Sequence, residues 1–322
     1  MSKIKFIAEL CQNHNGSLSR LLDMVDRCAD NGADIIKMQS IYINDLTFRP
    51  VFENGYVFKK KKFFIKRDYS SEYKRLKKLE INYKDTEKFI KRCISKKVVP
   101  MTTCFSRNRI NDLYNLGFKH IKVASYDCGS FQMIRELSEK FNHLIISTGA
   151  TFDSEIIKTN EILKKKSIDY SFLHCITLYP TPLNNLNLSR IKYLSNLTKK
   201  KVGYSDHSKS WNSKSLLSSK ASIYYGAKMI EKHMTVLNES MTKDGAVSIR
   251  PEQISELKDF SSLSKEKQKL FLKRFKFNFR GNFKRSLSVE ELLNREYYRG
   301  RFASYSKKEK RFINNWEEIP IN

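Results

Sequence analysis

Short apolar runs alternate with amphipathic segments through the first 260 residues, and this rhythm constrains the fold more than any other feature. It is typical of repeated strand–helix units. The predicted strands are Lys5–Glu9, Ile35–Gln39, Val98–Thr102, His120–Ala124, Leu144–Ser147, Tyr170–His174, Lys201–Tyr204 and Met229–Lys232. The predicted helices are Leu18–Asn31, Tyr83–Ser95, Arg107–Leu116, Phe131–Lys140, Asp153–Lys164, Leu188–Thr198, Ser213–Tyr225 and Pro251–Leu257. Ser17 and Gly32 flank the first helix as a cap and a stop.

Eight strands and eight helices in strict alternation predict an α/β protein, a (β/α)8 TIM barrel. Such a barrel takes about 250 residues, so we assign residues 1–262 to it and residues 263–322 to a short basic C-terminal extension. A doubly wound sheet is the alternative, because periodicity does not reveal whether a sheet closes.

Two segments depart from the rhythm. Residues 41–82 place a long, basic, aromatic-rich stretch between the second strand and its helix, and loops of that length are usually functional or mobile. The tail from Ser264 contains the run FLKRFKFNFRGNFKR and continues without a further strand–helix unit. No Gly/Ser linker separates this tail, so we expect it to dock on the barrel.

The net charge is strongly positive: 61 Lys and Arg against 34 Asp and Glu give +27. Nucleic-acid binding is one interpretation of such a charge. Most lysines are spread over predicted helix faces, with denser stretches at 59–67 and 265–285, which favours a solvated basic surface. We expect weak non-specific nucleic-acid binding and steering of anionic substrates.

Six cysteines stand at positions 11, 28, 93, 104, 128 and 175 without a CxxC pair, which predicts free buried thiols in a reducing compartment. The N-terminus has no signal-peptide pattern, and no run of about 18 apolar residues predicts a membrane span. We therefore expect a cytoplasmic protein with no membrane partner.

Polar residues gather where the predicted strands end, which is where barrels of this kind hold their active sites. Lys37 and Lys122 stand inside apolar strands, where an unpaired lysine is costly. Each alone is compatible with a structural salt bridge. Together with the hydroxyls of Thr103, Ser125 and Ser205 they predict a phosphate or carboxylate site.

His207 and His233 follow adjacent strands at matching positions. Two neutral imidazoles there suit a divalent metal with open coordination sites. We find no obvious third protein ligand, so the metal would be held weakly and partly by substrate. His14 and His174 are compatible with either a core or a ligand role, whereas His120 and His143 begin strands at the opposite rim and are interpreted as structural.

Seven strings in one order resemble the N-acetylneuraminate synthase (NeuB-type) family of bacterial sialic acid synthases. They are FIAELCQNHNGS, ADIIKMQ, KVASYDCGSF, ISTGA, LHCITLYPTP, VGYSDHS and GAKMIEKHMT, spread over residues 4–260. The resemblance implies condensation of phosphoenolpyruvate with an N-acyl sugar aldehyde, by default N-acetylmannosamine, in a homodimeric enzyme.

The resemblance also implies roles for individual residues. Phosphoenolpyruvate would be held by Lys37, Thr103, Lys122, Ser125, Thr177 and Ser205. Mn2+ or Mg2+ would be bound by His207 and His233. Asp127 would position or deprotonate the attacking water, which makes Asp127, Lys122 and Lys37 the catalytic candidates. The sugar would be contacted by Gln39, Tyr179 and Asp244.

The chain departs from the family pattern in three places. In the family that the chain resembles, a C-terminal antifreeze-like (SAF) domain reaches over the partner subunit and supplies an arginine, and we expect this domain to be missing or degenerate here. Arg285, Arg299 and Arg301 are the candidate substitutes. Gly245 stands where many relatives have histidine, and Asn15 where some have glutamate.

The acceptor sugar and the activity itself have alternatives. A diacetamido hexose would give a legionaminic or pseudaminic acid instead of sialic acid. A barrel that has lost catalysis and binds nucleic acid or an anionic glycan is the alternative from another class of function.

Overall fold

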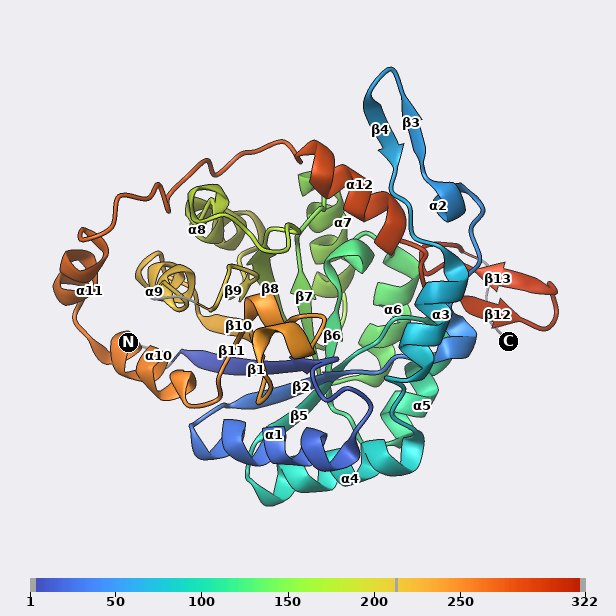
Figure 1. The fold of residues 1–322 in the computed structure, drawn as a ribbon, viewed down its shortest axis with the longest axis horizontal. Coiled ribbons are helices and arrows are strands. Elements are labelled where there is room, and N and C mark those ends of the chain that lie inside the picture. Colours follow the sequence, from blue (N-terminus) through green and yellow to red (C-terminus); the bar gives the residue numbers. More distant parts are fainter. Residues whose placement is uncertain (1–3, 212–213, 319–322) are drawn as a thin grey trace.

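The computed structural model of this protein describes residues 4–211 and 214–318, and its core is a closed barrel of eight parallel strands (Figure 1). The strand order is β1-β2-β5-β6-β7-β8-β9-β10, and β1 pairs with β10 to close the sheet. The bounds are β1 Lys5–Cys11, β2 Ile35–Gln39, β5 Val99–Thr103, β6 His120–Val123, β7 His143–Ser147, β8 Asp169–Cys175, β9 Val202–Asp206 and β10 Met229–Met234. Closure confirms the predicted TIM barrel and excludes the doubly wound sheet. A short strand, β11 (Ser248–Ile249), adds to β10.

Helices surround the barrel on its outer face. They are α1 Leu18–Asp30, α4 Tyr83–Ser95, α5 Ile110–Asn115, α6 Phe131–Lys140, α7 Asp153–Lys164, α8 Ser189–Thr198, α9 Leu217–Tyr224 and α10 Gln253–Ser262. Three of them match the predicted bounds to the residue. The helix predicted over 107–116 begins as a 3-10 turn at Arg107–Arg109, and α9 begins later than predicted. The predicted start of α9 at Ser213 lies outside the described residues.

The inner face of the barrel has an apolar floor and a polar mouth. Its floor is a cluster of buried side chains, one from each of six strands: Ile7, Ile35, Met101, Ile145, Leu173 and Met229. Successive strand residues point to opposite faces, so the residue two positions later points inward again. Those residues are Glu9, Lys37, Thr103, Ser147, Cys175 and Glu231. The two-residue period of the strands therefore places a layer of mostly polar and charged side chains directly above the apolar floor.

The outer face of β9 and β10 carries a buried ion pair between Lys232 and Asp206, whose Nζ and Oδ1 atoms lie 3.3 Å apart. Ser219 in α9 donates a hydrogen bond to the same carboxylate, at 2.6 Å. Each partner directly precedes a candidate metal ligand, His233 or His207. Because an unpaired buried charge is costly, this pair fixes the two strand ends relative to each other.

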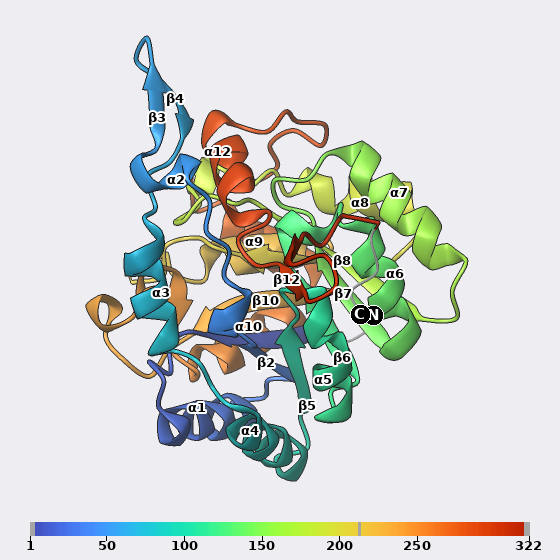
Figure 2. The ribbon, with the colours of Figure 1, turned by 90° about the vertical axis from the view of Figure 1, so that its right-hand side faces the viewer.

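The segment between β2 and α4 forms its own small structure. It contains η1 Ile43–Asp45, α2 Val51–Asn54, a hairpin of β3 (Tyr56–Phe58) and β4 (Lys61–Phe64), and α3 Tyr69–Lys77. The hairpin projects from the body in Figures 1 and 2. A separate apolar cluster, with Leu46 and Leu76 from this segment and Phe302 from the tail, joins the two segments.

The C-terminal extension docks along the barrel, as expected. It contains α11 Lys265–Leu272, α12 Val289–Tyr298 and a hairpin of β12 (Ser304–Ser306) and β13 (Arg311–Ile313). Backbone hydrogen bonds join residues 279 and 280 to the start of α8. Figures 1 and 2 both place α12 beside the β3–β4 hairpin.

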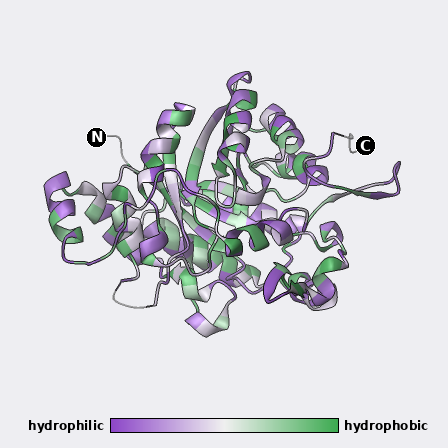
Figure 3. Ribbon diagram, turned by 90° about the horizontal axis from the view of Figure 1, so that it is seen from above, coloured by the Kyte–Doolittle hydropathy of each residue, from purple (hydrophilic) through white to green (hydrophobic). Residues whose placement is uncertain are grey.

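In Figure 3, hydrophilic residues (purple) and hydrophobic residues (green) alternate along the helices around the barrel. Within the described residues, no helix combines the length and the hydropathy that a membrane span requires.

Candidate active site

A cavity of about 440 Å³ opens at the mouth of the barrel. Every residue predicted for the site lines it: Lys37, Gln39, Thr103, Lys122, Ser125, Asp127, Thr177, Tyr179, Ser205, His207, His233 and Asp244. The strand-end pattern thus identified one shared space from residues spread over two thirds of the chain. The extension and the segment before α4 also contribute to its wall, through Arg67, Arg75, Asn294, Tyr298, Arg301 and Phe302.

Lys37 is paired within the barrel. Its ammonium contacts the carboxylate of Glu9 and lies 3.8 Å from Glu231, and it donates to the hydroxyl of Thr103 at 3.2 Å. Burial lowers the pKa of Lys37 to about 8, an effect that the charge of Glu231 opposes. Lys37 therefore forms the structural salt bridge that a buried lysine can make, with Glu9 as its partner.

Lys122 has a different environment, although it is equally buried. Its ammonium donates to the carbonyl of its neighbour Val123 at 2.9 Å. The charges of Lys37 and Lys122 outweigh the effect of burial on Glu231 and lower the pKa of that carboxyl. With no ion-pair partner among residues 4–211 and 214–318, Lys122 is the better placed of the two lysines to bind an anion.

Hydroxyl groups surround the space beside Lys122. Those of Thr177 and Ser147 are buried and find no hydrogen-bond partner among the described residues. Ser125 accepts a hydrogen bond from the backbone N–H of Gly149. A side chain at Gly149 would collide with Thr177 and Cys175 and crowd Ser125, so the glycine keeps this space open. A buried hydroxyl without a hydrogen-bond partner costs free energy, and a bound ligand that supplies the partner removes this cost.

The two predicted metal ligands lie side by side. The ring centroids of His207 and His233 are 5.5 Å apart. Burial lowers the pKa of His207 to about 4 and that of His233 well below its ordinary value, so both rings are neutral at neutral pH. The Nδ1 atom of His207 lies 3.1 Å from the carbonyl of Ile176, which directs its proton there and leaves Nε2 as a free ligand atom. These donors fit a divalent cation.

The other histidines have structural surroundings. His174 is fully buried and its Nε2 contacts the carbonyl of Leu186 at 2.7 Å. His14 accepts from the backbone of Gly16 within a turn. His120 and His143 stack at the start of their strands, with centroids 5.5 Å apart. None of the four lines the cavity.

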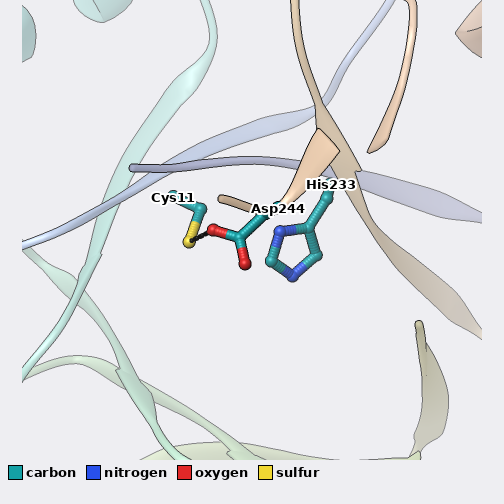
Figure 4. A group of neighbouring side chains, drawn as sticks. All are labelled: Cys11, His233 and Asp244. Atoms are coloured by element: carbon teal, nitrogen blue, oxygen red, sulfur yellow. Dashed lines mark hydrogen bonds between the residues drawn. The ribbon is translucent and has the colours of Figure 1, made fainter. Parts of the chain in front are cut away.

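The sequence offers no obvious third ligand, but the structure brings two further residues that could bind a metal close to His233. Cys11 and Asp244 lie next to His233, and one ligand atom from each of the three lies within 4.8 Å of the others (Figure 4). Cys11 ends β1 and Asp244 precedes β11, so these two residues are separated by 233 positions in the sequence. No local sequence pattern links residues so far apart.

Asp127 lines the cavity and is held by the extension. Its Oδ1 accepts from Asn315 and from Ser130, both at 2.9 Å. Burial raises the pKa of Asp127, whereas these hydrogen bonds and the charge of Arg299 act to lower it. Asn315 also donates to the carbonyl of Phe105, so it links the extension to two strand ends.

The remaining wall contains the predicted sugar contacts. Tyr179 is half exposed, and its hydroxyl lies 3.1 Å from Nε2 of His233. Gln39 accepts from Gln12, whose own oxygen accepts from Arg75.

Of the three candidate arginines, only Arg301 lines the cavity, and it pairs with Glu72. Arg285 instead pairs with Glu291, and Arg299 lies over Trp316.

Two positions that depart from the resemblance have local explanations. A side chain at Gly245 would collide with the carbonyl of Glu239, which explains why a larger residue is excluded. Asn15 donates to the carbonyl of Met241 in an exposed turn outside the cavity.

A comparison with protein families identifies the chain. A model described as the NeuB family matches residues 24–268. The chain belongs to the NeuB family.

Individual relatives agree with this NeuB assignment. The chain is 28% identical over 260 residues to the N,N'-diacetyllegionaminic acid synthase of Campylobacter jejuni, covering 80% of this chain and 75% of the relative. It is 24% identical over 252 residues to the human N-acetylneuraminate-9-phosphate synthase, covering 78% and 67%. Its fold is similar to the crystal structure of a sialic acid synthetase from Leptospira borgpetersenii, with a TM-score of 0.70, 26% identity and coverage of 92% and 91%.

Several polar or reactive residues that line this NeuB-family cavity were not among the predicted ones, including Glu9, Cys11, Ser147 and Glu231. Glu9 and Glu231 had a signal in the sequence, because an acid within an apolar strand is as unusual as a lysine. Each lies two residues after an inward-pointing residue of the apolar floor, and each carboxylate faces the ammonium of Lys37. A search for opposite charges on neighbouring strands would have found them.

The contact between Asn315 and Asp127 predicts a measurable pKa. Asn315→Leu removes a hydrogen bond that stabilises the ionised carboxylate, so the pKa of Asp127 rises, by about one unit for a bond worth roughly 1.4 kcal/mol. NMR titration of the labelled Asp carboxyl carbons measures it. Asn314→Leu, which removes a contact with Glu317 instead, serves as the control. An unchanged Asp127 pKa in Asn315→Leu contradicts the assignment.

Proposed function

We propose that this chain condenses phosphoenolpyruvate with an N-acyl hexosamine aldehyde and water to give a nonulosonic acid and phosphate. The observation that carries the proposal is the single cavity in a NeuB-family barrel that collects every predicted residue. The relatives named for sialic and legionaminic acid synthesis support the product class. N-acetylmannosamine is the default acceptor, and a diacetamido hexose is the alternative.

The phosphoenolpyruvate half of the site would be held by Lys122 with the hydroxyls of Thr103, Ser125, Thr177 and Ser205. The buried hydroxyl of Thr177 gains a partner when an anion oxygen binds, which favours occupancy. Lys37 would contribute charge while its pairing with Glu9 keeps it fixed. Such preorganised donors orient the substrate before reaction.

The reaction forms one carbon–carbon bond and one carbon–oxygen bond, the latter from water, and breaks the carbon–oxygen bond to phosphate. C3 of phosphoenolpyruvate attacks the aldehyde carbon, and the aldehyde oxygen takes up a proton. Water adds to the cationic C2 and loses a proton, for which Asp127 would be the base. The tetrahedral intermediate then breaks its C2–O bond and releases phosphate. Asn315 and Ser130 would keep Asp127 oriented toward that water.

His207 and His233 would hold the divalent cation, Mn2+ or Mg2+. A cation there supplies Lewis-acid polarisation of the aldehyde oxygen. The hydrogen bond from His207 to the Ile176 carbonyl keeps the ring oriented for this role.

The acceptor half of the site would be completed by the extension of the same chain. Arg301 and Tyr298 line the cavity opposite the strand ends, with Gln39, Tyr179 and Asp244 as the predicted sugar contacts. Arg301 is held by Glu72, so its guanidinium has a fixed position at the mouth. In this proposal the tail supplies the cavity with an arginine, Arg301.

Phosphate release tests the proposed reaction. The protein incubated with phosphoenolpyruvate, Mn2+ and a panel of N-acyl hexosamines should release phosphate with at least one of them. His207→Ala should abolish turnover, and His120→Gln, at the opposite rim, should not. If no sugar supports release, the enzyme hypothesis fails. Binding of DNA or RNA that survives physiological salt would then favour the binding-module alternative.

The two halves of the site can be separated kinetically. Lys122→Ala should raise the KM for phosphoenolpyruvate by about 10- to 100-fold, as expected for the loss of a charged hydrogen bond. Arg301→Ala should raise the KM for the sugar and leave that for phosphoenolpyruvate nearly unchanged. Lys119→Ala, an exposed lysine just before β6, is the control for charge. A wild-type KM for phosphoenolpyruvate in Lys122→Ala would show that the anion binds elsewhere.

A further inference from the structure

Cys11 has an unusual backbone conformation at the mouth of the barrel. It ends β1 with a φ of 47°, in the left-handed region that side chains other than glycine rarely adopt. The pairing of β1 with β2 shifts register between Glu9 and Cys11, so a bulge turns this residue out of the regular strand. The thiol lines the cavity while the residue stays buried.

The thiol faces two further metal-binding groups. Its Sγ donates to Oδ2 of Asp244 at 2.8 Å, and the ring of His233 lies beside that carboxylate (Figure 4). One ligand atom from each of the three residues lies within 4.8 Å of the others, which is close enough for one cation. The three groups come from the end of β1, from β10 and from the turn before η6 (Gly245–Val247).

A second observation is that the hydrogen bonding of the buried His233 ring is incomplete. Its ring is 4% exposed, and its Nδ1 finds no hydrogen-bond partner among the described residues. A buried imidazole nitrogen without a partner is unfavourable unless a ligand completes it. The nearby cation Arg75 is occupied by Glu72 and by Gln12, so it does not take this place.

We propose that Cys11 and Asp244 join His233, the neighbour of His207, as ligands of the cation, which makes this a thiolate-containing metal centre. The inference rests on the metal part of the proposed function. When the cation binds, the S–H bond of Cys11 breaks, its proton passes to solvent and a sulfur–metal bond forms, with no change of oxidation state. Asp244, which the resemblance assigns to the sugar, becomes a metal ligand.

The donor set selects the class of metal. Thiolate sulfur and imidazole favour Zn2+ and Co2+, whereas Mg2+ prefers oxygen ligands. The chain should therefore bind Zn2+ or Co2+ more tightly than Mg2+, in a way that depends on Cys11.

Cobalt substitution tests this directly and does not need turnover. The full chain, stripped of metal and loaded with Co2+, should show a near-ultraviolet sulfur-to-cobalt charge-transfer band. Cys11→Ser should lose the band and bind Zn2+ about 10-fold more weakly or worse, measured by equilibrium dialysis. Cys11→Gly, which suits the left-handed backbone, is the second variant and should behave in the same way if serine disturbs folding.

Two matched cysteines complete the experiment. Cys175 also lines the cavity, and its Sγ lies 3.7 Å from Nδ1 of His207, so it is the competing thiol. Cys128 is buried away from the cavity. Both Cys175→Ser and Cys128→Ser should keep the band. Loss of the band in Cys175→Ser but not in Cys11→Ser, or bound Co2+ without any band, overturns the proposal. Because these readouts are spectroscopic, an inactive enzyme that shows the band would contradict only the proposed reaction.

Discussion

The pairing of Lys37 with Glu9 and Glu231 inside the barrel is the interaction on which the mouth of this molecule depends. An apolar floor lies directly below these groups, so their charges cannot be solvated from that side. Removing one partner of such a buried pair costs about 3–5 kcal/mol, because the other charge is left uncompensated. The three side chains come from β1, β2 and β10, which meet where the barrel closes. The pairing therefore holds the closing strands in register and fixes the charges around which the cavity is built.

Much of the fold could be predicted from the sequence, because the barrel follows from local periodicity. Each strand is a short apolar run, and helices such as Tyr83–Ser95 carry their own caps and apolar faces. The predicted site residues other than Asp244, which came from the resemblance alone, stand at strand ends, and these share one rim in any closed parallel barrel. The predicted roles of these residues remain predictions, because position in a cavity does not show what each group does.

What could not be predicted depends on contacts between distant segments. The hydrogen bond from Asn315 to Asp127 spans 188 residues, and no periodic pattern links the two positions. The position of Cys11 in the cavity could not be predicted for another reason. The bulge after Glu9 gives it a backbone conformation that strand counting does not anticipate. The docking of the tail was expected from the lack of a linker, but the arginine that reaches the cavity could not be chosen among three candidates.

Two elements outside the barrel rhythm complete the mouth and hold each other in place. The segment before α4 supplies Arg75 and Glu72, and Glu72 fixes Arg301 of the tail. The tail in turn supplies Phe302 to the apolar cluster that contains Leu46 and Leu76. The wall that we propose for the acceptor is thus formed within one chain, whereas the proposed phosphoenolpyruvate side follows from the barrel alone.

The most direct measurement of the central claim is a crystal structure of the chain with phosphoenolpyruvate and Mn2+, with the metal located by anomalous scattering. The account predicts the phosphate and carboxylate of phosphoenolpyruvate in contact with Lys122, Ser125 and Thr177, and the metal beside His207 and His233. Phosphoenolpyruvate bound outside this cavity, or a metal peak remote from both histidines, would contradict it.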